Sequence, residues 1–219
     1  MSQPTIPRPA LSGRMLTLDP GEVGQRGMYK LLIGGVLPRP IAFISTISTE
    51  AVTNLAPFSF FNGVSSNPPC LSVSITRKND GSKKDTLRNI EATRQFVVNS
   101  SPAWLVDQIN SCSAEFPHGV SEFEMVGLTP AKSARVRAPR VAECPLAFEC
   151  ELYQTVEIGD GSQGSSTLVI GKIVAVQVDE SAIREGKLLI EKLEPLSRLG
   201  GLSYGLTREI FDLPRPKVT

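Results

Sequence analysis

The stretch TNLAPFSFFN, residues 53–62, follows shortly after another strand-like stretch, IAFISTI, at residues 41–47. The earlier stretch is almost wholly apolar and β-branched until Ser45 and Thr46, which is typical of a strand. Pro57 cannot donate a hydrogen bond to a sheet, so its strand must bulge or lie at a sheet edge. Backbone groups beside Pro57 are then available to a ligand. The alternative is an ordinary kinked strand with a partly exposed aromatic patch.

Strand signals dominate the rest of the chain. Apolar residues alternate with polar ones at residues 71–76 and again at residues 168–178, where Lys172 breaks the alternation. Short strands are also expected at residues 96–99 and 149–158. The glycine- and serine-rich run at residues 159–166 predicts a long hairpin loop rather than a domain linker.

Two helices are predicted among these strands. The first begins at the capping signature formed by Ser82 and Asp85, and the second begins with Ser101 as the cap and Pro102 in the first helical position. Apolar residues recur on one face of each helix, namely Leu87 and Ile90 in the first and Leu105, Ile109 and Cys112 in the second. Many strands with a few inserted helices predict a mainly β fold, a β-barrel with helical elaborations.

Composition excludes several classes of protein. The chain has 219 residues, 41% of them hydrophobic and 21% charged, with a net charge of +1. These values argue against a disordered or fibrous chain, and against nucleic acid or an anionic membrane as a partner. No stretch approaches the roughly 20 apolar residues of a membrane span, and residues 1–14 lack the apolar core of a signal peptide.

The cysteines and the single histidine argue against a metal site. The chain has four cysteines without a CxxC pair, so a zinc site is not expected. Buried, reduced thiols in a cytoplasmic protein are the expected state of these cysteines.

Basic residues crowd the predicted start of the first helix. Lys83 and Lys84 lie beside a helix N-terminus, whose partial positive charge disfavours them. An anion docked on the free backbone N–H groups would reverse that effect and use both lysines. The alternative is a solvated basic loop with screened charges. The residues themselves leave both interpretations open.

Several motifs, taken in order, resemble the flavin reductase-like family, which includes flavoredoxin and the small reductase components of two-component monooxygenases. The motifs are RPIAFIST (39–46), NLAPFSFFN (54–62), SSNPP (65–69) and KDTLRN (84–89), followed by GLTP (127–130), PLAFEC (145–150) and RLGG (198–201). The resemblance covers roughly residues 34–204. One departure is the loop STEAV at residues 48–52, where many relatives carry a tight Asp/Gly turn.

The resemblance implies a split β-barrel that holds FMN non-covalently near the interface of a homodimer. Residues 1–25 are then an N-terminal arm, residues 26–206 the FMN-binding domain, and residues 207–219 a C-terminal tail. By motif, the residues expected to line the flavin ring and ribityl chain are Ser45, Thr46, Thr53, Asn54, Leu55, Ala56 and Ser59, with Asn62 and Ser65 nearby. The residues expected to hold the phosphate are Arg77, Lys84 and Thr86, which now favours an anion over a solvated loop.

Three conspicuous residues are given weaker interpretations. His118 has no G-x-S-x-G elbow to make a hydrolase triad, so we expect it to be structural or exposed, with substrate contact as a minor alternative. Trp104 is expected to pack on the barrel without a functional role. Arg198 either caps the turn at Gly200-Gly201 or reaches the flavin site of a partner subunit.

The reaction implied is hydride transfer from NADH or NADPH to N5 of bound FMN. FMN carries that chemistry, and no side-chain acid or base is strictly required, so no catalytic residue is named. No Rossmann G-x-G-x-x-G motif marks a nicotinamide site. Two alternatives stay open: a flavoredoxin-type electron carrier between protein partners, and a non-enzymatic binding protein that kept the barrel.

Overall fold

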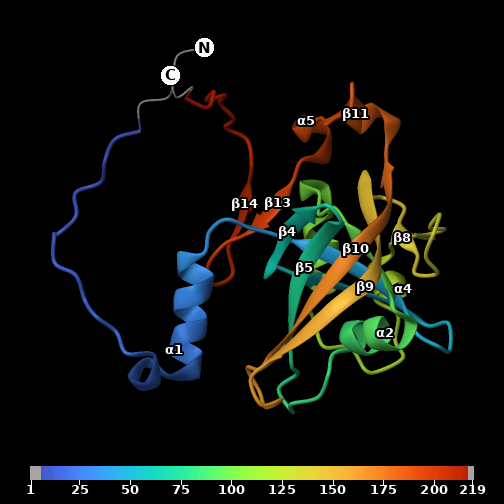
Figure 1. The fold of residues 1–219 in the computed structure, drawn as a ribbon, viewed down its shortest axis with the longest axis horizontal. Coiled ribbons are helices and arrows are strands. Elements are labelled where there is room, and N and C mark those ends of the chain that lie inside the picture. Colours follow the sequence, from blue (N-terminus) through green and yellow to red (C-terminus); the bar gives the residue numbers. More distant parts are fainter. Residues whose placement is uncertain (1–5, 217–219) are drawn as a thin grey trace.

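A large antiparallel sheet forms the centre of the protein. The computed structural model describes residues 6–216, in which seven strands pair in the order β3-β2-β6-β9-β10-β5-β4 (Figure 1). Their bounds are β2 (Ala42–Ile47), β3 (Thr53–Phe58), β4 (Phe61–Ser66), β5 (Pro69–Thr76), β6 (Gln95–Asn99), β9 (Leu146–Ile158) and β10 (Ser166–Val178). Each neighbouring pair is antiparallel. The predicted mainly β fold is confirmed.

The two edges of this sheet are β3 and β4, which follow each other directly along the chain. Ser59 and Phe60 alone join them, and among the described strands no ladder of hydrogen bonds pairs one edge with the other. The sheet is therefore split where a barrel would close. Pro57 lies in edge strand β3, where its missing N–H leaves no ladder bond unmade.

The strands predicted at residues 71–76, 96–99, 149–158 and 168–178 all lie within observed ones. Ile41 lies outside β2, and residues 53–62 form β3 and the start of β4, with Ser59 and Phe60 between them, rather than one strand. The run before Ser166 is the β9–β10 hairpin loop. Lys172 is exposed, on the face of β10 opposite to buried Val169 and Gly171. The β9–β10 register shifts on both sides of it, between Ile170 and Gly171 and between Ile173 and Ala175. Such irregularities bend a strand pair and increase its twist. Gly171 also fits a close approach, because a methyl group there would overlap the ring of Phe96.

Strand β2 is an apolar run broken only at Ser45 and Thr46, because both of its faces are covered. Ala42 and Ile44 join one hydrophobic cluster, to which α2 (Asp85–Thr93) contributes Leu87 and Ile90. Phe43 joins a second cluster with residues from the segments that follow β6. A strand buried on both faces reads as a continuous apolar run. All four cysteines are buried and free of disulfides, as expected.

The helical faces were predicted correctly, but the predicted helix starts were wrong. Residue Lys84, not Ser82, occupies the N-cap position of α2, and its side chain makes no capping hydrogen bond. The backbone N–H of Ser82 instead donates to the carboxylate of Asp80, 2.8 Å away, in the preceding turn. Leu87 and Ile90 are both fully buried, so the apolar face holds.

The second helix also begins later than predicted. It starts as the 3-10 turn η1 (Ala103–Leu105), with Pro102 as its cap, and continues as α3 (Val106–Ser111). Ser101 does not cap it, because its hydroxyl donates to the carbonyl of Ile41 at 3.0 Å. The predicted packing of Trp104 was wrong, since this side chain is 52% exposed. The predicted apolar face is correct, because Leu105, Ile109 and Cys112 are buried.

Helix α1 (Pro20–Gly35) was not anticipated from the sequence, although its start is legible. The carboxylate of Asp19 accepts hydrogen bonds from the N–H groups of Gly21 and Glu22, and Pro20 takes the first helical position. None of its residues is buried, and the helix stands off the sheet (Figure 1). Gln25 ties it to the β9–β10 hairpin through the carbonyl of Gln163, 3.0 Å away.

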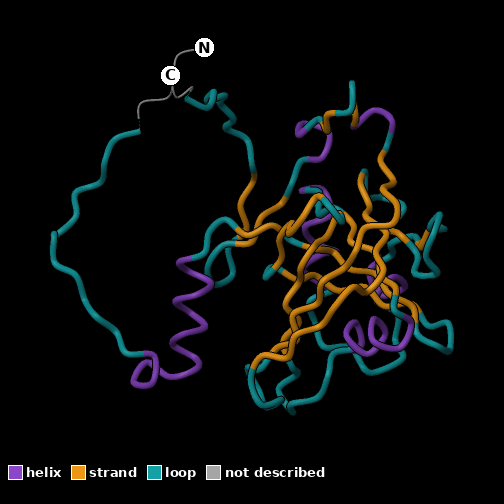
Figure 2. Tube along the Cα trace, in the orientation of Figure 1, coloured by secondary structure: helices purple, strands orange, loops and turns teal. Residues whose placement is uncertain are grey.

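Short elements complete the fold, and Figure 2 separates the helices from the strands. They are β1 (Arg39–Pro40), α4 (Glu122–Val126), β7 (Pro130–Ala131), β8 (Arg140–Val141), η2 (Glu180–Ala182), β11 (Ile183–Arg184), β12 (Lys187–Leu188), α5 (Ile190–Leu193), β13 (Leu196–Arg198) and β14 (Tyr204–Leu206). No helix within residues 6–216 has the length and apolar character needed to cross a membrane.

Candidate functional site

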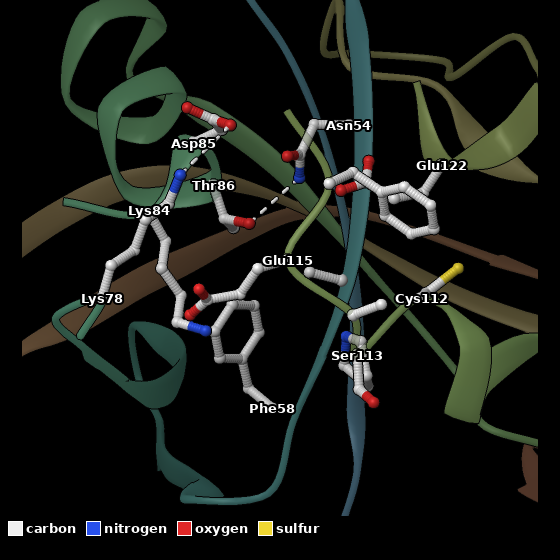
Figure 3. Close-up of a pocket in the computed structure, with 14 residues that line it drawn as sticks. Asn54, Phe58, Lys78, Lys84, Asp85, Thr86, Cys112, Ser113, Glu115 and Glu122 are labelled. Carbon is white, nitrogen blue, oxygen red and sulfur yellow. Dashed lines mark hydrogen bonds and ion pairs between the residues drawn. The ribbon is translucent and has the colours of Figure 1, made fainter. Parts of the chain in front are cut away.

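A cavity of about 190 Å³ lies between edge strand β3 and the first turn of α2 (Figure 3). Its walls come from β3, the loop before α2, the start of α2 and the segment after α3. Asn54 and Ala56 line it from β3, and Lys84 and Thr86 line it from the helix start. The sequence-predicted ring wall and the sequence-predicted phosphate site therefore meet in one cavity.

A buried hydrogen bond fixes the relation between these two walls. The side-chain amide of Asn54 donates to the hydroxyl of Thr86 at 3.0 Å, and both residues are buried. A second buried bond runs parallel to it, from the amide of Asn89 to the hydroxyl of Thr46, also at 3.0 Å. These bonds hold α2 against the sheet, so the N-terminus of α2 keeps a set position beside β3.

The two neighbouring lysines have different environments. Lys83 binds both carboxylate oxygens of Glu91, at 2.6 and 2.7 Å, so its charge is already paired. Lys84 lines the cavity, and within the described residues no carboxylate forms an ion pair with it. The expectation that a bound anion uses both lysines is therefore corrected to Lys84 alone. The reason is that Glu91 projects from α2 toward Lys83.

Other cavities adjoin the first one along β3. One of about 170 Å³ includes Thr53 and His118 and shares Asn54 with the first. Another of about 170 Å³ includes Ser59 and shares Lys84. The lining thus extends along the whole edge strand, which suits an elongated ligand better than a compact one.

Three residues expected at the ring are committed elsewhere. The hydroxyl of Ser45 donates to the carbonyl of Pro139, and Thr46 accepts the bond from Asn89 described above. The N–H of Leu55 donates to a carboxylate oxygen of Glu122 at 2.9 Å. Ser45, Thr46 and Leu55 are all buried, because β2 lies between β3 and β6 and the inner face of β3 packs on the core. Contact with a ligand stays a prediction for them.

Three further predicted residues lie away from this cavity. Asn62 and Ser65 are exposed on β4, at the other edge of the sheet, and Asn62 lines a separate opening of about 560 Å³ beside the end of α1. Arg77 forms an ion pair with Glu157 at 2.6 Å, and its Nε is buried without a hydrogen-bond partner. A contact between Arg77 and the phosphate therefore stays a prediction. The ion pair of Arg77 with Glu157 does not favour that contact.

Glu122 lines the cavity and was missed by sequence reasoning. It is only 8% exposed, and the pKa of its carboxyl is raised, chiefly by burial. Nothing in SEFEMV, residues 121–126, separates it from Glu124 as a buried acid. Burial also raises the pKa of the nearby Cys112 thiol to about 12, so that thiol stays protonated at neutral pH.

His118 and Arg198 each have a partner within the chain. The Nδ1 atom of His118 lies 2.8 Å from a carboxylate oxygen of Asp85, and the histidine is exposed. Arg198 donates to the carbonyl of Ser203 at 3.1 Å and lies over the ring of Tyr204. Arg198 therefore caps the turn that follows it, whereas a contact with a partner subunit stays a prediction.

Comparison with known proteins identifies the family. The family model described as flavin reductase like domain matches residues 34–195. The solved structure of nitrilotriacetate monooxygenase component B from Bacillus cereus is 39% identical, covers 92% of this chain and 100% of that chain, and has a TM-score of 0.88. The 2-nitrobenzoate 2-nitroreductase of Pseudomonas fluorescens is 30% identical, covers 92% of this chain and 96% of that chain, and has a TM-score of 0.82.

A third structure supports the fold alone. A Shewanella frigidimarina protein with a split barrel domain is 24% identical, covers 90% of this chain and 96% of that chain, and has a TM-score of 0.78. Its likeness agrees with the open seven-stranded sheet seen here. The fold is therefore a split barrel whose edge strand β3 lines the candidate site.

Proposed function

The chain belongs to the flavin reductase-like family, and from this we propose that the protein is an FMN-binding oxidoreductase that accepts a hydride from NADH or NADPH. The cofactor is FMN, held without a covalent bond along β3. One observation carries the proposal. An unpaired cation, Lys84, and the N-terminus of α2 face the same cavity as the polar and apolar side chains of β3.

The residues present fit the two ends of FMN. A phosphate is favoured at a helix N-terminus, and Lys84 adds a charge-assisted hydrogen bond there. A flat heterocycle needs apolar surface with a few polar groups, which Ala56, Pro57 and Asn54 supply. The carboxylate of Asp85, next to Lys84, repels an anion, but it is itself paired with Lys78, Arg88 and His118.

The protein's own contribution is orientation and exclusion of water. When bound, FMN supplies the hydride-accepting atom N5. The hydrogen bond between Asn54 and Thr86 keeps the ring wall and the phosphate site at a constant separation. The cavity beside Thr53 and His118 leaves room next to β3 in which a second ring could lie.

The decisive experiment is anaerobic mixing of the FMN-loaded protein with NADH and, separately, with NADPH. Bleaching of the flavin absorption band within seconds by either nucleotide is the expected result. If neither nucleotide bleaches the band while a reduced ferredoxin does, the protein is an electron carrier and the reductase proposal fails. If the purified protein binds no flavin at all, it is a non-enzymatic relative of the family.

A role as the reducing partner of an oxygenase is supported by one relative. The Bacillus cereus protein is named as a component of a monooxygenase, and the match covers the whole of that protein's chain. The name of the Pseudomonas fluorescens relative favours direct reduction of an aromatic nitro group instead. Transfer of the reduced flavin's electrons to a protein partner is the form that we propose.

We further propose a homodimer in the cytoplasm. Large apolar side chains of α1 and of the C-terminal segment are left exposed by the described residues 6–216; they include Leu31, Leu32, Ile210, Phe211 and Leu213. Exposed apolar surface of this kind is typical of a protein interface, and a second copy of the chain would cover it. Four buried, unpaired cysteines favour a reducing compartment.

A further inference from the structure

Two buried glutamates in this protein are held in opposite ways. Glu149 accepts hydrogen bonds from the backbone N–H groups of Ala134, Arg135 and Val136, and from the amide of Gln177. Burial would raise the pKa of Glu149, but these donors together lower it below its usual value. Four donors thus replace the water that a carboxylate needs.

Glu122 has no such support. Within the described residues its carboxyl accepts one hydrogen bond from another residue, the N–H of Leu55 at 2.9 Å. It is nearly as buried as Glu149, being 8% exposed. Burial is the largest cause of its raised pKa, and neighbouring Asp85 acts in the same direction. The site therefore favours the neutral form of Glu122 more than water does.

Charged and titratable groups face Glu122 from each element around the cavity. They are Lys78 and Lys84 before α2, Asp85 in α2, Cys112 after α3, and Glu115 in the following loop, with His118 paired to Asp85. The lysines favour the ionised form of Glu122, whereas the acids favour the neutral form. A phosphate bound at Lys84 would neutralise that lysine and add negative charge to the same cavity.

We propose that the protein binds FMN with uptake of a proton by Glu122, so that flavin affinity is controlled by pH through this residue. The inference rests on the proposed FMN site. A neutral carboxyl has both a donor and an acceptor, so it can hydrogen-bond the polar edge of a flavin, whereas a carboxylate can only accept. It also avoids placing a second negative charge beside the phosphate in one cavity of about 190 Å³.

The direction of the pH dependence follows from this linkage. A group that is protonated more strongly in the bound state favours binding at low pH. At pH values where Glu122 is already protonated in the free protein, Glu122 therefore adds no pH dependence to FMN affinity. Above that range the dissociation constant rises with pH, approaching about tenfold per pH unit for one linked proton.

The test compares Glu122→Gln with Glu124→Gln, because Glu124 lies on the same helix but is exposed. FMN dissociation constants are measured by flavin fluorescence from pH 6 to pH 9, and proton uptake by calorimetry in two buffers with different ionisation enthalpies. Glutamine imitates the neutral acid. We expect a steep pH profile in the wild type and in Glu124→Gln, and a flatter one in Glu122→Gln.

Comparing variants with the same ligand cancels the ionisation of the FMN phosphate itself. On binding FMN, the wild type should take up as much as one proton more than Glu122→Gln does. Equal proton uptake in the two proteins overturns the inference while leaving the proposed function intact. If Glu122→Gln does not fold, absence of proton uptake by the wild type overturns it. Failure of the wild type to bind FMN removes the proposed function as well.

Discussion

Replacing Lys84 by alanine removes a cation that lines the cavity and that, within the described residues, forms no ion pair, whereas Lys78 in the same lining is paired with Asp85. The adjacent Lys83 supplies a matched control, because its ammonium group is bound to Glu91 rather than to the cavity. The two variants differ by one position in sequence and remove the same charge. A general loss of positive potential would therefore affect both, whereas loss of a phosphate ligand affects only Lys84→Ala.

The expected magnitude follows from the environment of Lys84. A hydrogen bond to a charged group contributes about 1.5–3 kcal/mol. Lys84 is only partly buried, so solvent screens part of its charge and the lower half of that range applies. A loss of about 1.5–2 kcal/mol corresponds to a roughly 10–30-fold higher dissociation constant for FMN. The backbone N–H groups of α2 still hold the phosphate, so binding is weakened rather than abolished.

Fluorescence titration with FMN and with riboflavin measures this effect. Riboflavin lacks the phosphate, so its affinity should be nearly the same for wild type, Lys84→Ala and Lys83→Ala. FMN should lose affinity only with Lys84→Ala. A larger loss at low ionic strength than at high salt would agree with a charge contact.

Two results would refute the reasoning. Equal weakening of FMN and riboflavin by Lys84→Ala would place the lysine against the ring instead of the phosphate. Equal weakening of FMN by both lysine variants would mean that long-range potential, not a contact, accounts for the effect. In that case the helix N-terminus alone would be the anion site.

The remaining predictions concern stability and assembly. Glu149→Gln leaves the backbone donors without their carboxylate and should destabilise the fold by about 3 kcal/mol. The control Glu151→Gln changes an exposed residue and should alter stability little. Thermal unfolding measures both variants, and similar melting temperatures for the two would contradict this prediction. Because the folded-state pKa of Glu149 is lowered, its stabilisation is present above the ordinary glutamate pKa of about 4.3 and is lost as pH falls through the folded value. Light scattering should show a dimer, and a protein that is only monomeric with FMN fully bound would contradict the proposed homodimer.

Local patterns predicted the parts of the fold that depend on neighbours in sequence. Alternation of period two located the strands because successive side chains point to opposite faces. The apolar faces of α2 and α3 were correct for the same kind of reason, at helical spacing. Pro57 predicted either a bulge or a sheet edge because its missing N–H is a property of the residue itself, and the structure has the sheet edge.

Helix starts were less predictable because several residues compete for each cap. Ser82 and Ser101 both have the right side chain for capping, yet one lies in a preceding turn and the other bonds to Ile41, far away in sequence. Helix α1 shows the opposite case. Its Asp19 cap and its first-turn proline were readable, but none of its residues is buried in the protomer, so its apolar residues do not mark a face that packs on the core.

The sequence alone therefore determined the strands, the helical faces, the family and the segments that meet at the site. Tertiary structure decided which members of those segments face the cavity. It separated Lys84 from Lys83 through the position of Glu91, buried Ser45 and Thr46 by placing β2 inside the sheet, and brought Glu122 against Leu55. The physical reason is that strand order and helix docking depend on contacts between residues distant in sequence, and local periodicity does not encode those contacts.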